Sequence, residues 1–273
     1  MRLHRFHIDE LVGDRTELTI HSSELVNQLR HVLRLKVGEE AILFDGSGSD
    51  YKVVIRQFIG TDQTVFDVHE SMRSRFMPMR KTYLFAAVIK KDNFEFIVEK
   101  ATELGVTDII PIIAEHSEKK ALNEERLIKI SIEASEQSGR GDIPEIRPII
   151  SLKEAVNALK GNFSREESAG GTVVPISEHF SKLKRLQKRG ITAGQILKSN
   201  DIKCLVFHTD GEPFNQKDLP NDEPIAIFIG PEGGWSPEEI AMFHKNEIIV
   251  QCLGPQVLRA ETAVIAALSK VLL

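Results

Sequence analysis

Apolar and polar residues between residue 38 and about residue 72 follow a strand-like pattern. The runs Ala41–Asp45, Tyr51–Phe58 and Thr64–Val68 each have the length of a strand, and Gly, Asp or Thr residues separate them. Gly46-Ser-Gly48 lies between the first two runs and predicts a hairpin turn. This part of the chain therefore predicts a small antiparallel barrel or sheet.

Beyond residue 80 the pattern changes to alternating strands and helices. The strands are continuous apolar runs, and the helices carry their apolar residues on one face, as in Asn93–Leu104 before the stop signal Gly105. Such alternation predicts an α/β fold with a parallel sheet covered on both faces. The predicted strands are Thr82–Ile89, Val106–Ile113, Lys203–His208, Ile225–Ile229 and Ile248–Leu253, and the predicted helices are Asn93–Leu104, Glu124–Ser138, Ser151 to about Lys160, Ser236–Asn246 and Glu261–Leu273.

The change of pattern coincides with a basic stretch. Ser71–Lys91 contains six Lys and Arg residues and no acid, and Pro78 interrupts any regular element there. We place a domain boundary near residues 74–80, which divides the chain into domains 1–74 and 80–273. Residues 161–202 break the alternation, and Phe180–Asn200 is again basic without an acid. This segment predicts a partly mobile basic insertion or, equally well, a solvated helix face.

Composition excludes several classes of protein. The 273 residues have 41% hydrophobic side chains and a net charge of −5, which fits one large or two smaller globular domains and excludes disorder, collagen and disulfide mini-proteins. The net negative charge of the whole chain weighs against a nucleic-acid partner. The two basic stretches without acids are nevertheless compatible with local contact to a nucleic acid. No apolar run is long enough to span a membrane and no secretory signal is recognisable, so we expect a cytoplasmic protein.

Cysteine and histidine residues show no pattern of metal ligands. Cys204 and Cys252 lie inside apolar runs, where a buried thiol behaves as a small hydrophobe. The nine histidines have no convincing ligand spacing, and we expect no metal site.

The first candidate site is the loop that follows the strand Ile225–Ile229. Ile229-Gly-Pro-Glu-Gly-Gly-Trp-Ser236 leads into a helix with Ser236 as N-cap, Pro237 at its first position and Glu239 completing a capping box. The glycines favour a ligand-binding loop over a plain tight turn. The loop lacks the lysine of a phosphate loop and the third glycine of a dinucleotide loop, and Glu232 would repel a phosphate. It fits a sulfonium nucleoside better than ATP or NAD.

Two further segments are candidates. Leu253-Gly-Pro-Gln-Val-Leu-Arg-Ala-Glu-Thr-Ala263 repeats the pattern of a strand, a Gly-Pro loop and a helix, with Arg259 and Glu261 at the helix entry, where they could also simply pair with each other. The last helix is apolar nearly all round, which predicts burial on several sides and a subunit interface. In Glu136-Gln-Ser-Gly-Arg140, Arg140 is equally well a substrate contact or a surface arginine.

These segments together resemble the bacterial RsmE family, which methylates N3 of a uridine in 16S ribosomal RNA with S-adenosylmethionine. The resemblance rests on Glu136–Arg140 with Pro144-Glu-Ile, on Ile229–Ser236 and on Leu253–Ala263, in this order, and Asn93–Gly105 and His31–Leu35 match as well. It implies a SPOUT domain with a C-terminal trefoil knot, a PUA-like N-terminal domain that contacts RNA, and a homodimer through the knot region. The family usually has a basic residue in place of Gln256 and a shorter connection in place of 161–202.

The resemblance also implies roles for individual residues. Uracil N3 is about as weak an acid as a tyrosine phenol, with a pKa of about 10, so Arg259 is expected to stabilise negative charge on the uracil and Glu261 or Glu232 to accept the proton. An assembly factor without catalysis and a ribose methyltransferase acting on transfer RNA remain alternatives. The expected cofactor-binding residues are Ile229, Gly230, Pro231, Glu232, Gly233, Gly234, Leu253, Gly254, Pro255, Val257, Leu258 and Thr262, and the expected RNA-binding residues are Arg34, Arg73, Arg75, Arg80, Lys90 and Arg140.

Overall fold

The computed structural model describes residues 3–117, 122–159, 202–219 and 223–273. Apart from Ile202, the basic insertion predicted at 161–202 lies outside these residues. The chain forms two compact units. The first consists of Met1–Met77 and Ile132–Ile143, and the second of Pro78–Ser131 and Pro144–Leu273.

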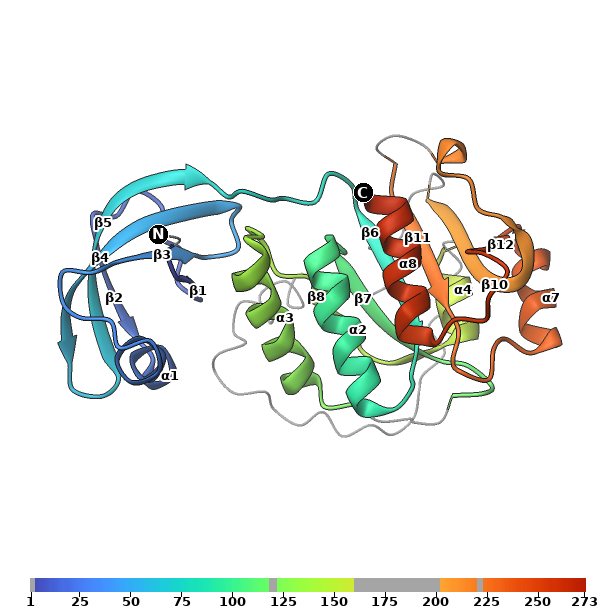
Figure 1. Cartoon of the computed structure of the whole chain (residues 1–273), viewed down its shortest axis with the longest axis horizontal. Helices are drawn as coiled ribbons and strands as arrows, with labels where there is room; N and C mark the ends of the chain where they lie inside the picture. The colour runs from blue at the N-terminus through green and yellow to red at the C-terminus, as the bar shows by residue number, and fades with distance from the viewer. Residues whose placement is uncertain (1–2, 118–121, 160–201, 220–222) are drawn as a thin grey trace. The chain divides into compact units, whose positions relative to one another are not determined.

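The first unit is built on a curled five-stranded sheet (Figure 1) of order β1-β3-β4-β5-β2. Pairing is antiparallel except between β1 and β3, which run parallel with Phe6 opposite Leu43. The expectation of a purely antiparallel sheet is wrong at this edge, because a strand near the N-terminus returns beside β3. The elements are β1 (Arg5–His7), β2 (Glu17–His21), α1 (Ser23–Asn27), a π-helical turn η1 (Gln28–Val32), β3 (Glu40–Phe44), β4 (Ser49–Ile59) and β5 (Gln63–Arg73).

The predicted hairpin between β3 and β4 is confirmed. Phe44 pairs with Asp50, and Gly46 and Gly48 between them have φ of +77° and +90°. These values lie in the left-handed region, which glycine adopts at little cost. The glycines therefore let β4 fold back onto β3.

The segment Ile132–Ile143 is held in the first unit through Arg5. The Arg5 guanidinium forms a bidentate pair with Asp50 at 3.0 and 2.7 Å, donates to the Ser135 carbonyl at 3.0 Å and stacks on the Phe44 ring. The His7 N–H donates to the Glu136 carboxyl at 2.9 Å. Burial, helped by the nearby charge of Glu133, raises the pKa of Glu136 to about 7 against the opposing His7 and Arg5 contacts.

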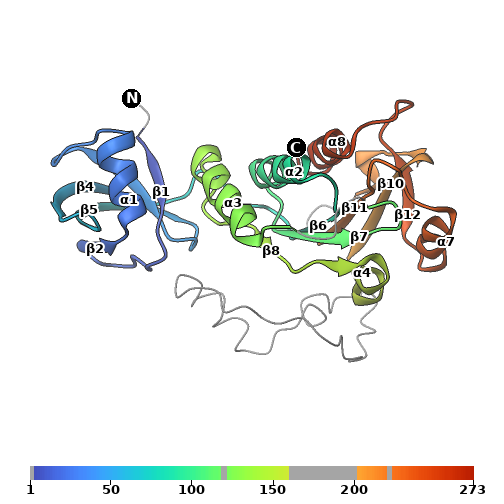
Figure 2. The same cartoon turned by 90° about the horizontal axis from the view of Figure 1, so that it is seen from below.

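The second unit contains a parallel sheet of order β12-β10-β11-β6-β7-β8, with β9 also paired to β7. Figure 2 shows α2 and α8 on one face and α4 on the other, as predicted. The elements are β6 (Thr82–Ala87), α2 (Lys91–Leu104), β7 (Asp108–Ile113), α3 (Glu124–Ser138, which continues into the first unit), β8 (Glu145–Ile146), β9 (Ile150–Ser151), α4 (Leu152–Leu159), β10 (Lys203–Pro213), a 3₁₀ turn η3 (Gln216–Asp218), β11 (Ile225–Ile229), α7 (Pro237–Lys245), β12 (Ile249–Cys252) and α8 (Ala260–Leu272).

The helix α8 differs from its prediction. It buries one face, formed by Ala260, Val264, Ala267, Leu268 and Val271, against the sheet and α2. Its other apolar residues, among them Ile265 and Leu272, are only partly buried within the chain. The described residues of one chain therefore bury only one face of α8 fully, and its burial on several sides stays a prediction.

Cys204 on β10 and Cys252 on β12 are half-buried free thiols, and burial raises the pKa of Cys204 to about 11. Within the described ranges no cluster of His, Cys, Asp and Glu has the arrangement of a metal site. Among the same residues, no helix combines the length and the apolar character needed to cross a bilayer.

Replacing Glu136 by glutamine should change how stability depends on pH. A glutamate with its usual pKa of 4.5 when unfolded and about 7 when folded makes the folded protein bind the extra proton between these pH values. Its contribution to stability therefore falls as the pH rises through this window. Glutamine stays neutral and keeps an oxygen for the His7 N–H. We expect E136Q to raise the unfolding free energy at pH 8 by about 1–3 kcal/mol, with no gain at pH 5.

Thermal and urea unfolding at both pH values measure this difference. Glu70→Gln removes the same charge from an exposed position on β5 and serves as the control. An equal gain for E136Q at pH 5 and pH 8 would contradict titration of Glu136 as its cause.

Candidate functional site

The two predicted ligand loops follow the strands on either side of β10. Phe207 on β10 pairs with Ile229 of β11 on one side and with Gln251 of β12 on the other. All three strands run in the same direction, so the loops after β11 and β12 leave the sheet at its carboxyl edge, on either side of β10 (Figure 1). Ligands of open parallel α/β sheets bind at this edge.

The loop after β11 has a fixed shape for several local reasons. A Cβ on Gly230 would lie 3.0 Å from the ring of Trp235, whose Nε1–H donates to the Phe207 carbonyl at 3.2 Å. Gly234 has φ of +71°. The predicted capping box is present, since Ser236 Oγ accepts from the Glu239 N–H at 3.3 Å and Glu239 Oε2 accepts from the Ser236 N–H at 2.9 Å. The helix α7 thus begins where the sequence predicts.

A third segment, the turn after β7, contacts this loop. His116 Nδ1 lies 3.1 Å from the carbonyl oxygens of both Gly233 and Gly234. The Glu115 N–H donates to Glu239 Oε1 at 2.9 Å. No motif in the sequence indicates His116, because its partners lie more than a hundred positions away along the chain.

The loop after β12 offers free backbone donors. Among the described residues, the N–H groups of Gly254, Gln256, Val257 and Leu258 form no hydrogen bond. The Val257 side chain is 84% exposed, whereas Leu253 packs against the core. This stretch of unused amides beside an apolar surface suits a ligand with hydrogen-bond acceptors and an apolar ring system.

The helix entry after this loop carries the two predicted catalytic side chains. Arg259 is exposed at the N-cap position of α8, and within the described parts of the chain it pairs neither with Glu261 nor with any other group. Glu261 Oε2 is buried and accepts no hydrogen bond from a described residue. Thr262 is exposed. The simple pairing of Arg259 with Glu261 is therefore not formed.

Gln251 on β12 was not predicted. It is 8% exposed, and its Oε1 is likewise buried without a donor from the described residues. Because registered residues of neighbouring strands point to the same face, its side chain lies on the face of Phe207 and Ile229, which α8 covers. The signal in the sequence is a lone polar residue within an apolar strand.

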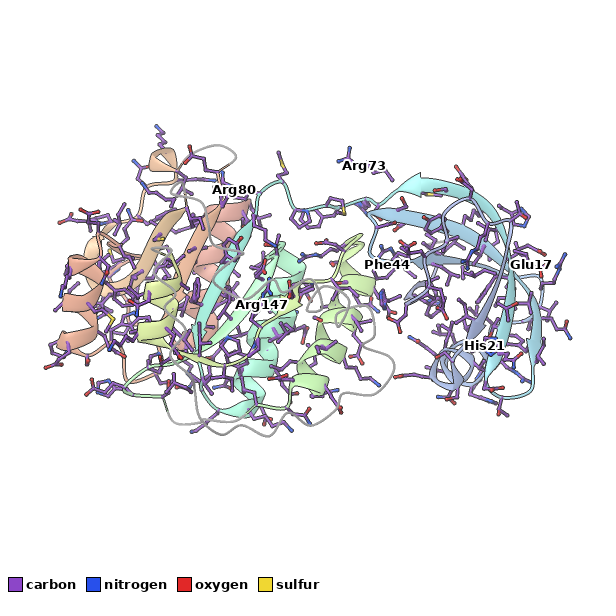
Figure 3. All side chains as sticks on the ribbon, turned by 180° about the vertical axis from the view of Figure 1, so that it is seen from behind. Glu17, His21, Phe44, Arg73, Arg80 and Arg147 are labelled. Carbon is purple, nitrogen blue, oxygen red and sulfur yellow. The ribbon has the colours of Figure 1, made fainter. Side chains whose placement is uncertain are left out.

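The predicted RNA-binding residues fall into both units. Arg34, Arg73 and Arg75 are exposed in the first unit, and Figure 3 shows Arg73 projecting from the end of β5. In the second unit Lys90 is exposed before α2 and Arg80 is half-buried.

Arg140 departs from its prediction. Its side chain is 0% exposed and forms a bidentate pair with Asp142 at 2.7 and 2.9 Å. A guanidinium used in this way is not presented to RNA. Because Asp142 lies in the same segment, the pair fixes the turn after α3, and the Gly141 N–H joins Ile132–Ile143 to the rest of the first unit by donating to the Phe76 carbonyl at 2.9 Å.

Fold and site together define a class, an open parallel α/β protein with a ligand site at the carboxyl ends of its strands. Residues 77–189 and 171–272 match the family model described as the RNA methyltransferase domain. The chain belongs to this family.

The resemblance to the RsmE family is confirmed by curated and solved relatives. Ribosomal RNA small subunit methyltransferase E of Rickettsia conorii is 27% identical, over 99% of this chain and 96% of the relative. A presumed methyltransferase from Legionella pneumophila, solved with bound S-adenosylmethionine, is 26% identical with a TM-score of 0.76, over 98% and 96% of the two chains. The Neisseria gonorrhoeae ribosomal RNA small subunit methyltransferase E, also solved with S-adenosylmethionine, shares the fold at 24% identity and a TM-score of 0.75, over 98% and 96%.

Substitutions at the two adjacent glycines should separate backbone strain from steric collision. A Cβ on Gly234 would meet no atom within 4 Å, so Gly234→Ala suffers only from the positive φ, which costs about 1–2 kcal/mol. Gly234→Asn should cost less, because asparagine tolerates this region. On Gly233 a Cβ would lie 2.8 Å from His116 Cβ, so Gly233→Ala should displace that contact as well.

Chemical denaturation measures the expected order, in which G234N is the most stable of the three variants. If G234A and G234N were equally destabilised, the backbone angle would not be the cause.

Proposed function

We propose that the protein transfers a methyl group from S-adenosylmethionine to N3 of a specific uridine in 16S ribosomal RNA of the small ribosomal subunit. The observation that carries the proposal is the pair of Gly-Pro loops that follow the two strands on either side of β10, in a chain of the RNA methyltransferase family. The relatives named as small subunit methyltransferases and the cofactor bound to the solved Legionella relative support it.

The residues at this edge fit the cofactor. The N–H groups of Gly254, Gln256, Val257 and Leu258, which have no acceptor among the described residues, match hydrogen-bond acceptors such as adenine nitrogens or a carboxylate. The buried Oε1 of Gln251, which has no donor among the same residues, matches an amino or hydroxyl donor. When bound, S-adenosylmethionine supplies an activated methyl group. The residues that would hold it are Ile229, Gly230, Pro231, Glu232, Gly233, Gly234, Leu253, Gly254, Pro255, Val257, Leu258 and Thr262.

The task left to the side chains is to make uracil N3 nucleophilic. With a pKa of about 10, N3 is protonated at neutral pH and must lose its proton or share it. Arg259 is exposed and has no partner among the described residues, so it is available to stabilise the negative charge that develops on the uracil carbonyl oxygens. Glu261 accepts the proton. The buried oxygen of Glu261 favours it over Glu232, which lies exposed on the glycine loop.

The two domains have different roles. Residues 1–74 form a PUA-like RNA-binding domain in which Arg34 and Arg73 contact RNA. Arg75, between the domains, contacts RNA as well, and so do Arg80 and Lys90 of the methyltransferase domain, residues 80–273. The exposure of four of these five side chains supports the assignment. A ribosomal substrate places the enzyme in the cytoplasm.

The C-terminal region forms a trefoil knot and a homodimer interface. After β12 at the sheet edge the chain returns through α8 to pack on α2, and α8 leaves Ile265 and Leu272 partly exposed. A second copy would cover these residues.

One experiment tests the reaction as a whole. Small ribosomal subunits that lack the modification are incubated with the protein and methyl-labelled S-adenosylmethionine, and nucleoside mass spectrometry locates the methyl group. We expect 3-methyluridine. RNA binding without transfer would indicate an assembly factor, and a 2′-O-methyl nucleoside would indicate a ribose methyltransferase.

Removing the arginine should reduce the chemical step without loosening the cofactor. We expect Arg259→Ala to lower kcat by about 10²–10³-fold, the usual effect of losing one charge-stabilising donor. The Kd for S-adenosylmethionine by calorimetry should stay within about threefold. Lys270→Ala, exposed in the last turn of α8, is the matched control. Normal methylation by R259A would exclude the assigned role.

Removing the carboxylate should produce a defect that alkaline pH repairs. We expect Glu261→Gln to lower kcat by about 10²–10⁴-fold at pH 7. The activity should then rise about tenfold per pH unit toward pH 10, because N3 ionises without a base. Glu232→Gln should show no such repair at alkaline pH, because Glu232 is assigned to cofactor binding and not to proton acceptance. A defect of E261Q that is independent of pH would argue against proton acceptance by Glu261.

A further inference from the structure

The turn Ala114–Ser117 is built to present His116 to the glycine loop. It is closed on itself by two hydrogen bonds, from the Ser117 N–H to the Ala114 carbonyl and from the Ala114 N–H to Ser117 Oγ, both 3.1 Å. Glu239, 6% exposed, fastens the same turn to the start of α7 through the Glu115 N–H. Because β6 lies between β7 and β11 in the sheet, these contacts bridge two strand ends that are not neighbours.

The two partners of His116 Nδ1 determine that this nitrogen carries a hydrogen. Both are carbonyl oxygens, which only accept, so Nδ1 carries the hydrogen and donates to both. A neutral ring with the proton on Nδ1 and a positively charged ring both satisfy this requirement.

Fixing these carbonyls fixes the peptide groups of the loop. A trans peptide has its C=O and N–H on opposite sides, so holding the Gly234 carbonyl also directs the Trp235 N–H away from His116. Within the described residues this N–H has no hydrogen-bond partner. The Gly234 N–H donates to the Pro231 carbonyl at 2.9 Å, which closes a turn within the loop. Gly233 and Gly234 have no side chains to restrict their backbone further, so the contact with His116 adds a restraint that the loop itself lacks.

We propose that His116 is a positioning residue, whose Nδ1–H holds the carbonyls of Gly233 and Gly234 so that the glycine loop keeps the conformation that binds S-adenosylmethionine. The inference rests on the proposed function. It adds a residue outside both Gly-Pro loops and requires no contact between His116 and the substrate. The close approach of Gly233 to His116 supports it, because a Cβ there would lie 2.8 Å from His116 Cβ.

The test compares three variants of the full-length protein. His116→Ala removes the donor. His116→Asn supplies an amide N–H close to the position of Nδ1. His244→Ala, at an exposed histidine in the last turn of α7, is the matched control. The measurements are the Kd for S-adenosylmethionine by calorimetry, kcat and KM on unmodified small subunits, and amide hydrogen exchange over residues 230–236.

We expect H116A to weaken cofactor binding about tenfold, as the loss of one shared hydrogen bond predicts, and to speed exchange of the loop amides. H116N should restore both to within about threefold, and H244A should match the unmodified protein. The KM for the cofactor should rise more than kcat falls.

Three results would overturn the proposal. The first is an H116A variant that binds the cofactor as tightly as H244A. The second is an H116N variant that binds normally but has lost kcat, which would give His116 a chemical role instead. The third is unchanged loop exchange in H116A. The exchange measurement needs no cofactor, so it tests the His116 contact even if the unmodified protein fails to bind S-adenosylmethionine and the proposed function falls.

Discussion

The site depends on one constraint, the parallel pairing of β10 with both β11 and β12. Phe207 stands in register with Ile229 and with Gln251, so the loops that follow β11 and β12 leave the sheet on either side of β10. Beyond Phe207, β10 continues to Pro213 with a register shift against β12. If either pairing shifted by one residue, every side chain of that strand would change face, and the core that buries Leu205 and Ile227 would be exposed. The hydrophobic core therefore fixes the register, and the register places the loops.

Two groups of buried polar atoms in the second unit differ in whether their hydrogen bonds are satisfied. Near the start of β7 the fully buried Asp108 accepts hydrogen bonds from Lys81 at 2.6 Å, Arg147 at 2.8 Å and Thr107 at 2.9 Å. At the carboxyl edge, Gln251 and Glu261 each keep a buried oxygen without a donor among the described residues. An unsatisfied buried acceptor costs about 1–3 kcal/mol. The first cluster contributes to stability, whereas the second retains a cost that a bound ligand with donors would remove.

The sequence predicted what depends on neighbouring residues. The bounds of α3 and β11, the capping box of Ser236 and Glu239, and the end of α2 at Gly105 all follow from local periodicity and cap chemistry, and the structure confirms them. Interactions between distant segments were not predictable. The parallel addition of β1 to β3 depends on a return of the chain that no motif encodes, and the contact of His116 with Gly233 crosses 117 positions. The two loops of the candidate site could thus be predicted from the sequence. The turn Ala114–Ser117, which contacts the loop after β11, could not.

Whether an arginine can contact a phosphate depends on its burial and on its partners within the protein. Arg5 and Arg140 are both in the first unit, yet one pairs with Asp50 and the other with Asp142, with side-chain exposures of 7% and 0%. Such arginines stabilise the fold and offer no charge to a phosphate. Arg73 is exposed and has no partner in the described parts of the chain, so it keeps its charge available. Electrostatic contact with RNA is local, because phosphate interactions are screened within about 10 Å at ordinary salt. A net acidic protein can therefore bind RNA, provided that its buried arginines are paired internally and its exposed ones are grouped.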